Sequence, residues 1–90
     1  MECAKIKVAL EIISTCDSFT ITEVDKQMII SVFDTAIKFL RQIGLVRTEM
    51  LAMYAILKES TWNDQYFCIV TRQMNSLVYP VIKRCISYFN

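Results

Sequence analysis

The chain has 90 residues with ten basic and nine acidic side chains, so its net charge of +1 creates no overall field toward nucleic acid or anionic membrane. It contains one glycine, one proline and no histidine. This composition argues against an all-β fold, a glycine-rich phosphate loop and any catalytic pair that requires histidine. We therefore expect one all-α domain over residues 1–90 and no enzyme activity.

Residues 3–16 predict a first amphipathic helix, because their apolar side chains recur at helical spacing on one broad face. Lys7 and Glu11 lie four residues apart on the opposite face, where they can form an ion pair. The polar connection that follows contains Phe19, and we expect this ring to fold back onto the core. The first helix thus supplies one face of a buried interior.

The longest amphipathic pattern covers residues 20–44 and predicts the helix around which the others pack. Its apolar arc is about 200° wide, against the roughly 100° that a surface helix needs, so we expect neighbours on two or three sides. Thr20 and Glu23 form a candidate capping box, and Thr22 is an alternative cap. Gly44 suits the left-handed conformation that closes a helix.

A third helix is predicted from Thr48, a candidate cap, to Ser60. Residues 50–57 are eight consecutive apolar residues, and a helix that is apolar all round is buried all round. Two interpretations stay open. Either this helix is the centre of the monomer, or one of its sides is an interface.

The last helix is predicted over residues 65–88, with Asn63 or Asp64 as its cap and an apolar stripe facing inward. Pro80 lacks an amide hydrogen and crowds the carbonyl four residues before it, so we expect a kink or break over residues 76–79. The sequence therefore predicts a small all-α bundle of four helices around a long central helix, or of five if Pro80 splits the last one.

The four cysteines, Cys3, Cys16, Cys68 and Cys85, lack the paired spacing of a Cys₄ metal site. We expect four buried thiols, with no metal and no cofactor. Glu11 interrupts the first apolar run before a secretory signal can form, which favours a reducing compartment, most simply the cytoplasm. No uncharged run reaches the ~18 residues that a membrane span requires.

The apolar content of 54% is high for a soluble domain and predicts self-association. A monomer of this length shelters one inward stripe per helix, whereas the first two arcs are wider and the third helix is apolar all round. We interpret the chain as a non-catalytic helical protein-interaction module, an accessory or adaptor protein that forms a twofold homodimer or binds a partner helix. The candidate contact residues are Ile6, Ile13, Met50, Met53 and Tyr54.

An alternative interpretation is a helical dimer that binds RNA or DNA without sequence preference. Residues 65–90 carry three basic and no acidic side chains, and the second helix adds a short basic row. These positions could contact phosphates, although an ordinary solvated helix face explains them more simply. The candidate contacts are Lys38, Arg41, Arg72, Tyr79, Lys83 and Arg84.

Overall fold

The structure, a computed structural model, describes residues 2–89 and the side chains as far as Ser87. No strand occurs within this range, and the prediction of an all-α fold is confirmed. The helices are α1 (Glu2–Ile13), α2 (Glu23–Gln42), α3 (Thr48–Glu59) and α4 (Asp64–Phe89), with a short 3₁₀ helix, η1 (Ser60–Trp62), between α3 and α4.

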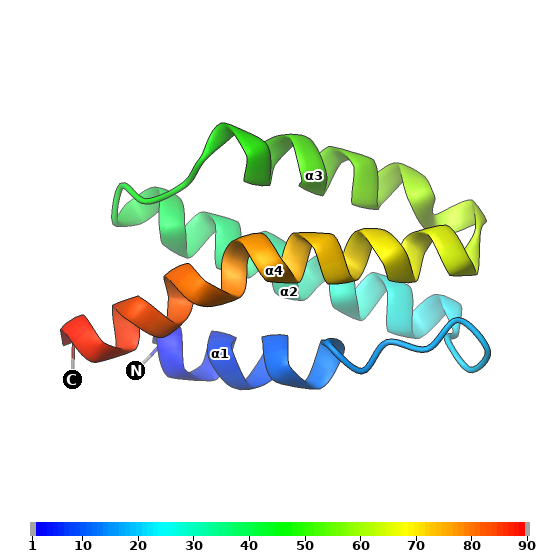
Figure 1. Ribbon diagram of the computed structural model, residues 1–90, viewed down its shortest axis with the longest axis horizontal. Coiled ribbons are helices and arrows are strands. Elements are labelled where there is room, and N and C mark those ends of the chain that lie inside the picture. The colour runs from blue at the N-terminus through cyan, green and yellow to red at the C-terminus, as the bar shows by residue number, and fades with distance from the viewer. Residues whose placement is uncertain (1, 90) are drawn as a thin grey trace.

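Each helix runs antiparallel to the one before it (Figure 1). The four helices form a ring in which each packs against the next and α4 closes on α1, while α2 and α4 also meet across the middle. A bundle of four helices is therefore confirmed. The 26-residue α4 is longer than the 20-residue α2 and shares the diagonal with it, so the structure does not single out residues 20–44 as the centre.

The core takes one apolar stripe from each helix. Its largest fully buried side chains include Leu10 of α1, Phe33 and Leu40 of α2, Met50 of α3 and Phe67 of α4. The total accessible surface is 5471 Å², close to the ~5400 Å² expected for a compact monomer of this mass. The chain thus buries as much surface as a typical monomer of its mass. Its high content of apolar residues must therefore leave apolar side chains on the exposed surface.

Two helix ends differ from the sequence prediction. The helix α1 stops at Ile13, three residues short of the predicted residue 16, where the hydroxyl of Ser14 donates to the carbonyl of Glu11 at 2.6 Å. The cap of α2 is Thr22 rather than Thr20. Its hydroxyl accepts from the Asp25 amide at 3.1 Å, and the Asp25 carboxylate accepts from the Thr22 amide at 2.9 Å, so the capping box lies two residues further along the chain than predicted.

The other helix ends mostly follow the prediction. Gly44 adopts φ 76°, and the next amide, that of Leu45, donates to the carbonyl of Leu40 at 2.8 Å, which closes α2. Asn63 caps α4 by accepting from the Tyr66 amide at 2.9 Å. Thr48 is the first residue of α3 and not its cap.

The helix α4 continues through Pro80, so the described chain has four α-helices and not five. Its ribbon nevertheless changes direction in the orange segment, and the end of the helix slopes toward the start of α1 (Figure 1). Because proline cannot donate to the carbonyl four residues before it, the helix is expected to bend at this point without breaking. The prediction of a kink is confirmed, and the prediction of a break is wrong.

The prediction that Phe19 folds back onto the core is wrong. Phe19 is 90% exposed, because its amide donates to the Asp17 carboxylate at 3.0 Å and the resulting turn directs the ring outward. Within α3 only Met50 and Leu57 are buried, so this helix is not the centre of the monomer and exposes the other side of its apolar run. The interpretation that this side is an interface stays a prediction.

Candidate interaction surfaces

One side of α1 is joined to α4 by directional polar contacts, and we call this boundary the α1–α4 seam. The Arg72 guanidinium donates to the carbonyl of Cys16 at 2.9 Å, and the Asn75 amide donates to the carbonyl of Leu10 at 3.4 Å. One turn further on, the Tyr79 hydroxyl donates to the Glu11 carboxylate at 2.5 Å. These contacts fix the register of α1 along α4.

The Glu11 carboxylate is the charged centre of the seam. Its hydrogen bond from Tyr79 lowers the pKa of Glu11, to which Lys7 at 3.4 Å contributes as well. The same hydrogen bond raises the pKa of Tyr79, and the Lys83 ammonium lies 5.5 Å from the centre of the Tyr79 ring. The predicted Lys7–Glu11 ion pair is thus confirmed. Each group has a partner, so the cluster is suited to holding two helices together.

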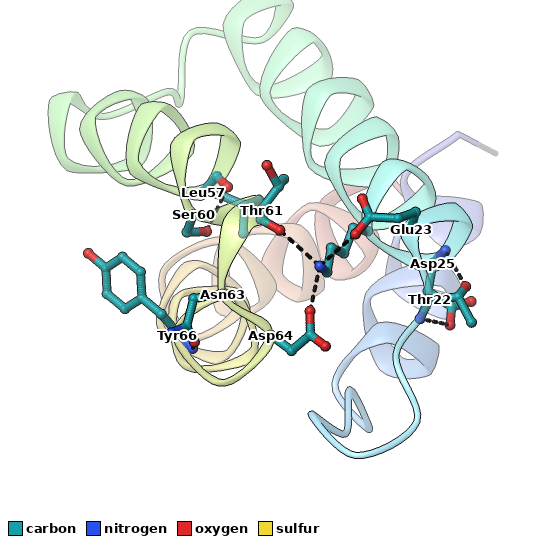
Figure 2. A network of polar contacts seen from close by, with 10 residues as sticks. Thr22, Glu23, Asp25, Leu57, Ser60, Thr61, Asn63, Asp64 and Tyr66 are labelled. Atoms are coloured by element: carbon teal, nitrogen blue, oxygen red, sulfur yellow. Dashed lines mark hydrogen bonds and ion pairs between the residues drawn. The ribbon is translucent and has the colours of Figure 1, made fainter.

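A buried lysine joins the start of α2 to the start of α4. The Lys26 ammonium contacts the carboxylates of Asp64 at 2.5 Å and Glu23 at 3.0 Å and donates to the carbonyl of Thr61 at 2.8 Å. Figure 2 shows these three residues converging from α2, η1 and α4. The hydrogen bond to Asp64, followed by that to Glu23, raises the pKa of Lys26. The amine therefore stays protonated and its donors are occupied, which fits a structural ion cluster rather than a nucleophile.

Lys26 was not recognised from the sequence, although a signal exists. It lies three residues before Ile29 and seven before Phe33, so it continues the row of buried residues on α2. A lysine in that row must find partners inside the fold. Glu23 lies only three positions before it, but Thr61 and Asp64 are more than 30 positions away, and the sequence alone does not place them beside Lys26.

The other side of α1 is apolar and open, and we call it the α1–α2 face. It consists of Val8 and Ile12 of α1 with Val24 and Met28 of α2, whose exposed fractions run from 48% to 78%. A groove of about 620 Å³ lies between the two helices. Its lining combines apolar side chains such as Met28 with the polar groups of Glu2, Lys5 and Ser31 at its margins. An apolar floor with polar margins is suited to packing against another protein.

A second exposed apolar group lies near the junction of α3 and α4, and we call it the α3–α4 face. Its members are Ile56, Trp62, Tyr66 and Ile69, all of them exposed. Tyr66 points away from the Lys26 cluster (Figure 2). The described residues thus include a second group of exposed apolar side chains, and none of its members was among the predicted contact residues.

The predicted interface residues are mostly inside the monomer. Ile6, Ile13 and Met50 are buried in the core, so their side chains are not accessible to a second chain. Met53 and Tyr54 are half-buried against that core. The Tyr54 hydroxyl donates to Asp34 of α2 at 3.1 Å. Of the predicted set, only Met53 and Tyr54 therefore keep partly exposed side chains.

The predicted nucleic-acid contacts are divided between α2 and α4, and those on α4 include Tyr79, Lys83 and Arg84 around one hollow. On α2 the Lys38 ammonium pairs with Asp34 at 2.9 Å, and because Asp34 also binds Tyr54 this pair lies toward α3. Arg72 and Tyr79 are instead bound to α1 in the seam. The remaining predicted residues are exposed, with Arg41 on α2 and Lys83 and Arg84 on α4.

The described residues contain no group of three His, Cys, Asp or Glu side chains that could hold a metal ion. Three of the four cysteines are buried, and Cys16 is half-buried rather than buried as predicted. In the described part of the chain, no helix combines the length and apolar character that crossing a membrane requires.

Comparisons with protein-family models, with curated proteins and with solved structures find no match to this chain. A functional interpretation therefore depends on the surfaces described above.

Proposed function

We propose that the chain is a non-catalytic protein-interaction module that pairs with a second copy of itself through the α1–α2 face. The observation that carries this proposal is the exposure of Val8, Ile12, Val24 and Met28 on α1 and α2, with Met28 lining a groove between the two helices and Ile12 and Met28 lining a second hollow there. Large apolar side chains that gather at one place on a monomer are typical of an interaction site.

A second copy is a suitable occupant because each chain carries the same apolar surface, and a twofold axis lets both surfaces cover each other without leaving an open end. Burying apolar area contributes roughly 25 cal/mol per Å², and a standard interface covers about 800 Å² on each partner. The opposite charges of Glu2 and Lys5 at the margin of the groove also allow a twofold neighbour to pair acid with base.

The absence of histidine and the occupied ammonium of Lys26 both support a role without catalysis. Two carboxylates of the described chain are likewise engaged with neighbouring side chains. Glu11 binds Tyr79, and Asp34 binds Lys38.

Light scattering coupled to gel filtration over a dilution series tests the pairing. We expect a mass of twice 10.5 kDa at micromolar concentration and a return to the single-chain mass for Met28→Glu, because a carboxylate on the apolar face would be desolvated in the dimer. Ile69→Glu is the matched control, since Ile69 and Met28 are both 48% exposed but lie on different faces.

A mass of 10.5 kDa for the wild-type chain at every concentration would exclude the dimer. A dimer that Ile69→Glu disrupts and Met28→Glu leaves intact would move the interface to the α3–α4 face.

The alternative of nucleic-acid binding has one supporting observation. Lys83 and Arg84, with Tyr79 and Ser87, line a hollow of about 440 Å³ beside Pro80. Phosphate binding there should weaken steeply with salt and be lost in Lys83→Ala/Arg84→Ala. Fluorescence anisotropy with single-stranded and double-stranded RNA and DNA at low salt checks this. We expect no binding, and salt-sensitive binding lost in that variant would favour the alternative.

A further inference from the structure

The fold brings together two cysteines that are 52 positions apart in the chain. Cys16 lies in the turn after α1, and Cys68 lies in the second turn of α4. Arg72, one turn beyond Cys68, donates to the carbonyl of Cys16 at 2.9 Å and so ties the backbone of Cys16 to this part of α4. The thiols of Cys16 and Cys68 are also close enough for Cys68 to raise the pKa of Cys16.

The two thiols differ in access. Cys68 is 1% exposed, whereas Cys16 is half-buried and belongs to a turn rather than a helix. A small reagent can therefore reach Cys16 first. Because residues 14–17 are not held by helical hydrogen bonds on both sides, the turn can make the small backbone adjustment that disulfide geometry requires.

We propose that Cys16 and Cys68 are a covalent modification site, at which exchange with a low-molecular-weight disulfide such as oxidised glutathione forms one intrachain disulfide. The Cys16 thiolate attacks one sulfur of the glutathione disulfide, which forms a mixed disulfide and releases one glutathione thiolate. The Cys68 thiolate then attacks the Cys16 sulfur and releases the second. The two cysteine thiols are oxidised, one glutathione disulfide is reduced to two glutathione thiols, and the two protons pass to the departing thiolates.

The surroundings make this exchange slow at neutral pH. Burial, followed by the hydrogen bond of the Cys16 thiol to Cys68, raises the pKa of Cys16 to about 12. Asp17 acts in the same direction and Arg72 opposes it. Only the thiolate reacts, so the rate of exchange should rise about tenfold for each pH unit between pH 7 and pH 9. The bond would fasten the end of α1, and the turn that carries Phe19, to α4.

Peptide mapping of the folded protein tests the proposal, because trypsin places each cysteine in a different peptide. Cleavage after Lys7 and Lys26 releases residues 8–26 with Cys16, and cleavage after Lys58 and Arg72 releases residues 59–72 with Cys68. The reduced protein is incubated with oxidised glutathione at pH 8.5, quenched with acid, alkylated and digested without reductant. We expect a species in which residues 8–26 are linked to residues 59–72.

Two variants make the test specific. Cys16→Ser should abolish the linked species. The double variant Thr15→Cys/Cys16→Ser keeps the number of thiols but moves one of them by a single position, onto an exposed residue, and should form at least tenfold less of the link. Circular dichroism checks that both variants fold. Cys16 that stays a thiol, carries only glutathione, joins another peptide or joins a second chain would overturn the proposal.

Discussion

The two sides of α1 are built in opposite ways. On the α1–α4 seam, Arg72, Asn75 and Tyr79 each donate a hydrogen bond to α1 or to the turn that follows it. On the α1–α2 face, Ile12 and Met28 instead line an open hollow and stay exposed. One short helix therefore has one side whose position is specified by direction-dependent contacts and another whose apolar surface is left uncovered.

The two sides of α1 therefore have different roles, which the buried area alone would not distinguish. Hydrogen bonds contribute modestly to stability but fix which residues face each other, whereas apolar contact is nondirectional and can be completed by another molecule. We infer that the seam sets the internal geometry of the bundle and that the α1–α2 face is free for association.

The largest expected effect distinguishes the inside of α1 from its exposed side. Leu10→Ala should lower the free energy of unfolding by about 2 to 5 kcal/mol, because it removes a fully buried side chain and leaves a cavity. Ile12→Ala, two residues away and 61% exposed, should change it by less than about 0.5 kcal/mol. Urea unfolding of the monomer measures both, and equal losses would contradict the assignment of the two sides.

The seam itself is tested by Arg72→Ala. Loss of the hydrogen bond to the Cys16 carbonyl should cost about 0.5 to 1.5 kcal/mol of unfolding free energy. The neighbouring exposed residue serves as control, and Gln73→Ala should be close to neutral. If both variants unfold at the same urea concentration, the contact contributes nothing measurable.

A smaller effect with a distinct pH profile is expected for Tyr79→Phe. The lowered pKa of Glu11 means that the charged carboxylate contributes stability above its ordinary value of 4.5, and that this contribution is lost as pH falls through the lowered pKa. The raised pKa of Tyr79 means that its contribution is present below 10.0 and lost as pH rises through the raised value.

The wild-type chain should therefore exceed Tyr79→Phe in stability between about pH 5 and pH 9, and the difference should shrink toward pH 3. Urea midpoints at several pH values measure it. A difference that stays constant from pH 7 to pH 3 would mean that the hydrogen bond to Glu11 is not its source.

The smallest effect on the monomer is expected on the α1–α2 face. Val24→Ser should change monomer stability by less than about 0.5 kcal/mol, because Val24 is 78% exposed. In the wild-type chain the melting temperature should rise with protein concentration, since association stabilises the folded state, and Val24→Ser should weaken that dependence. An unchanged concentration dependence would place Val24 outside the contact.

The helices themselves could be predicted because they depend on local patterns. Apolar periodicity located all four, and Gly44 and Asn63 marked ends that the structure places at the same positions. The errors arose where short polar side chains compete for the same backbone groups. Thr20 and Thr22 are equally suitable caps by sequence. In the structure Thr22 is the cap, because its hydroxyl and the Asp25 carboxylate each accept from the other residue's amide.

The candidate sites could not be predicted in the same way, since they depend on which helix lies beside which. Wide apolar arcs do not tell which part of the arc the neighbours cover, so buried Ile6 and exposed Ile12 look alike in the sequence. The contact between Cys16 and Cys68 likewise requires α4 to return to α1, and no local spacing records that return.

The ring arrangement also bears on how the chain folds. Three of its four boundaries join helices that are consecutive in the chain, so each forms by closing a short loop, whereas the α1–α4 boundary joins the two ends of the sequence. Local contacts cost little loop-closure entropy and form early, while distant ones form late. We expect the three helical hairpins to precede docking of α1 on α4. A chain in which that docking is delayed would keep its helices while leaving Leu10 and Phe67 exposed to solvent.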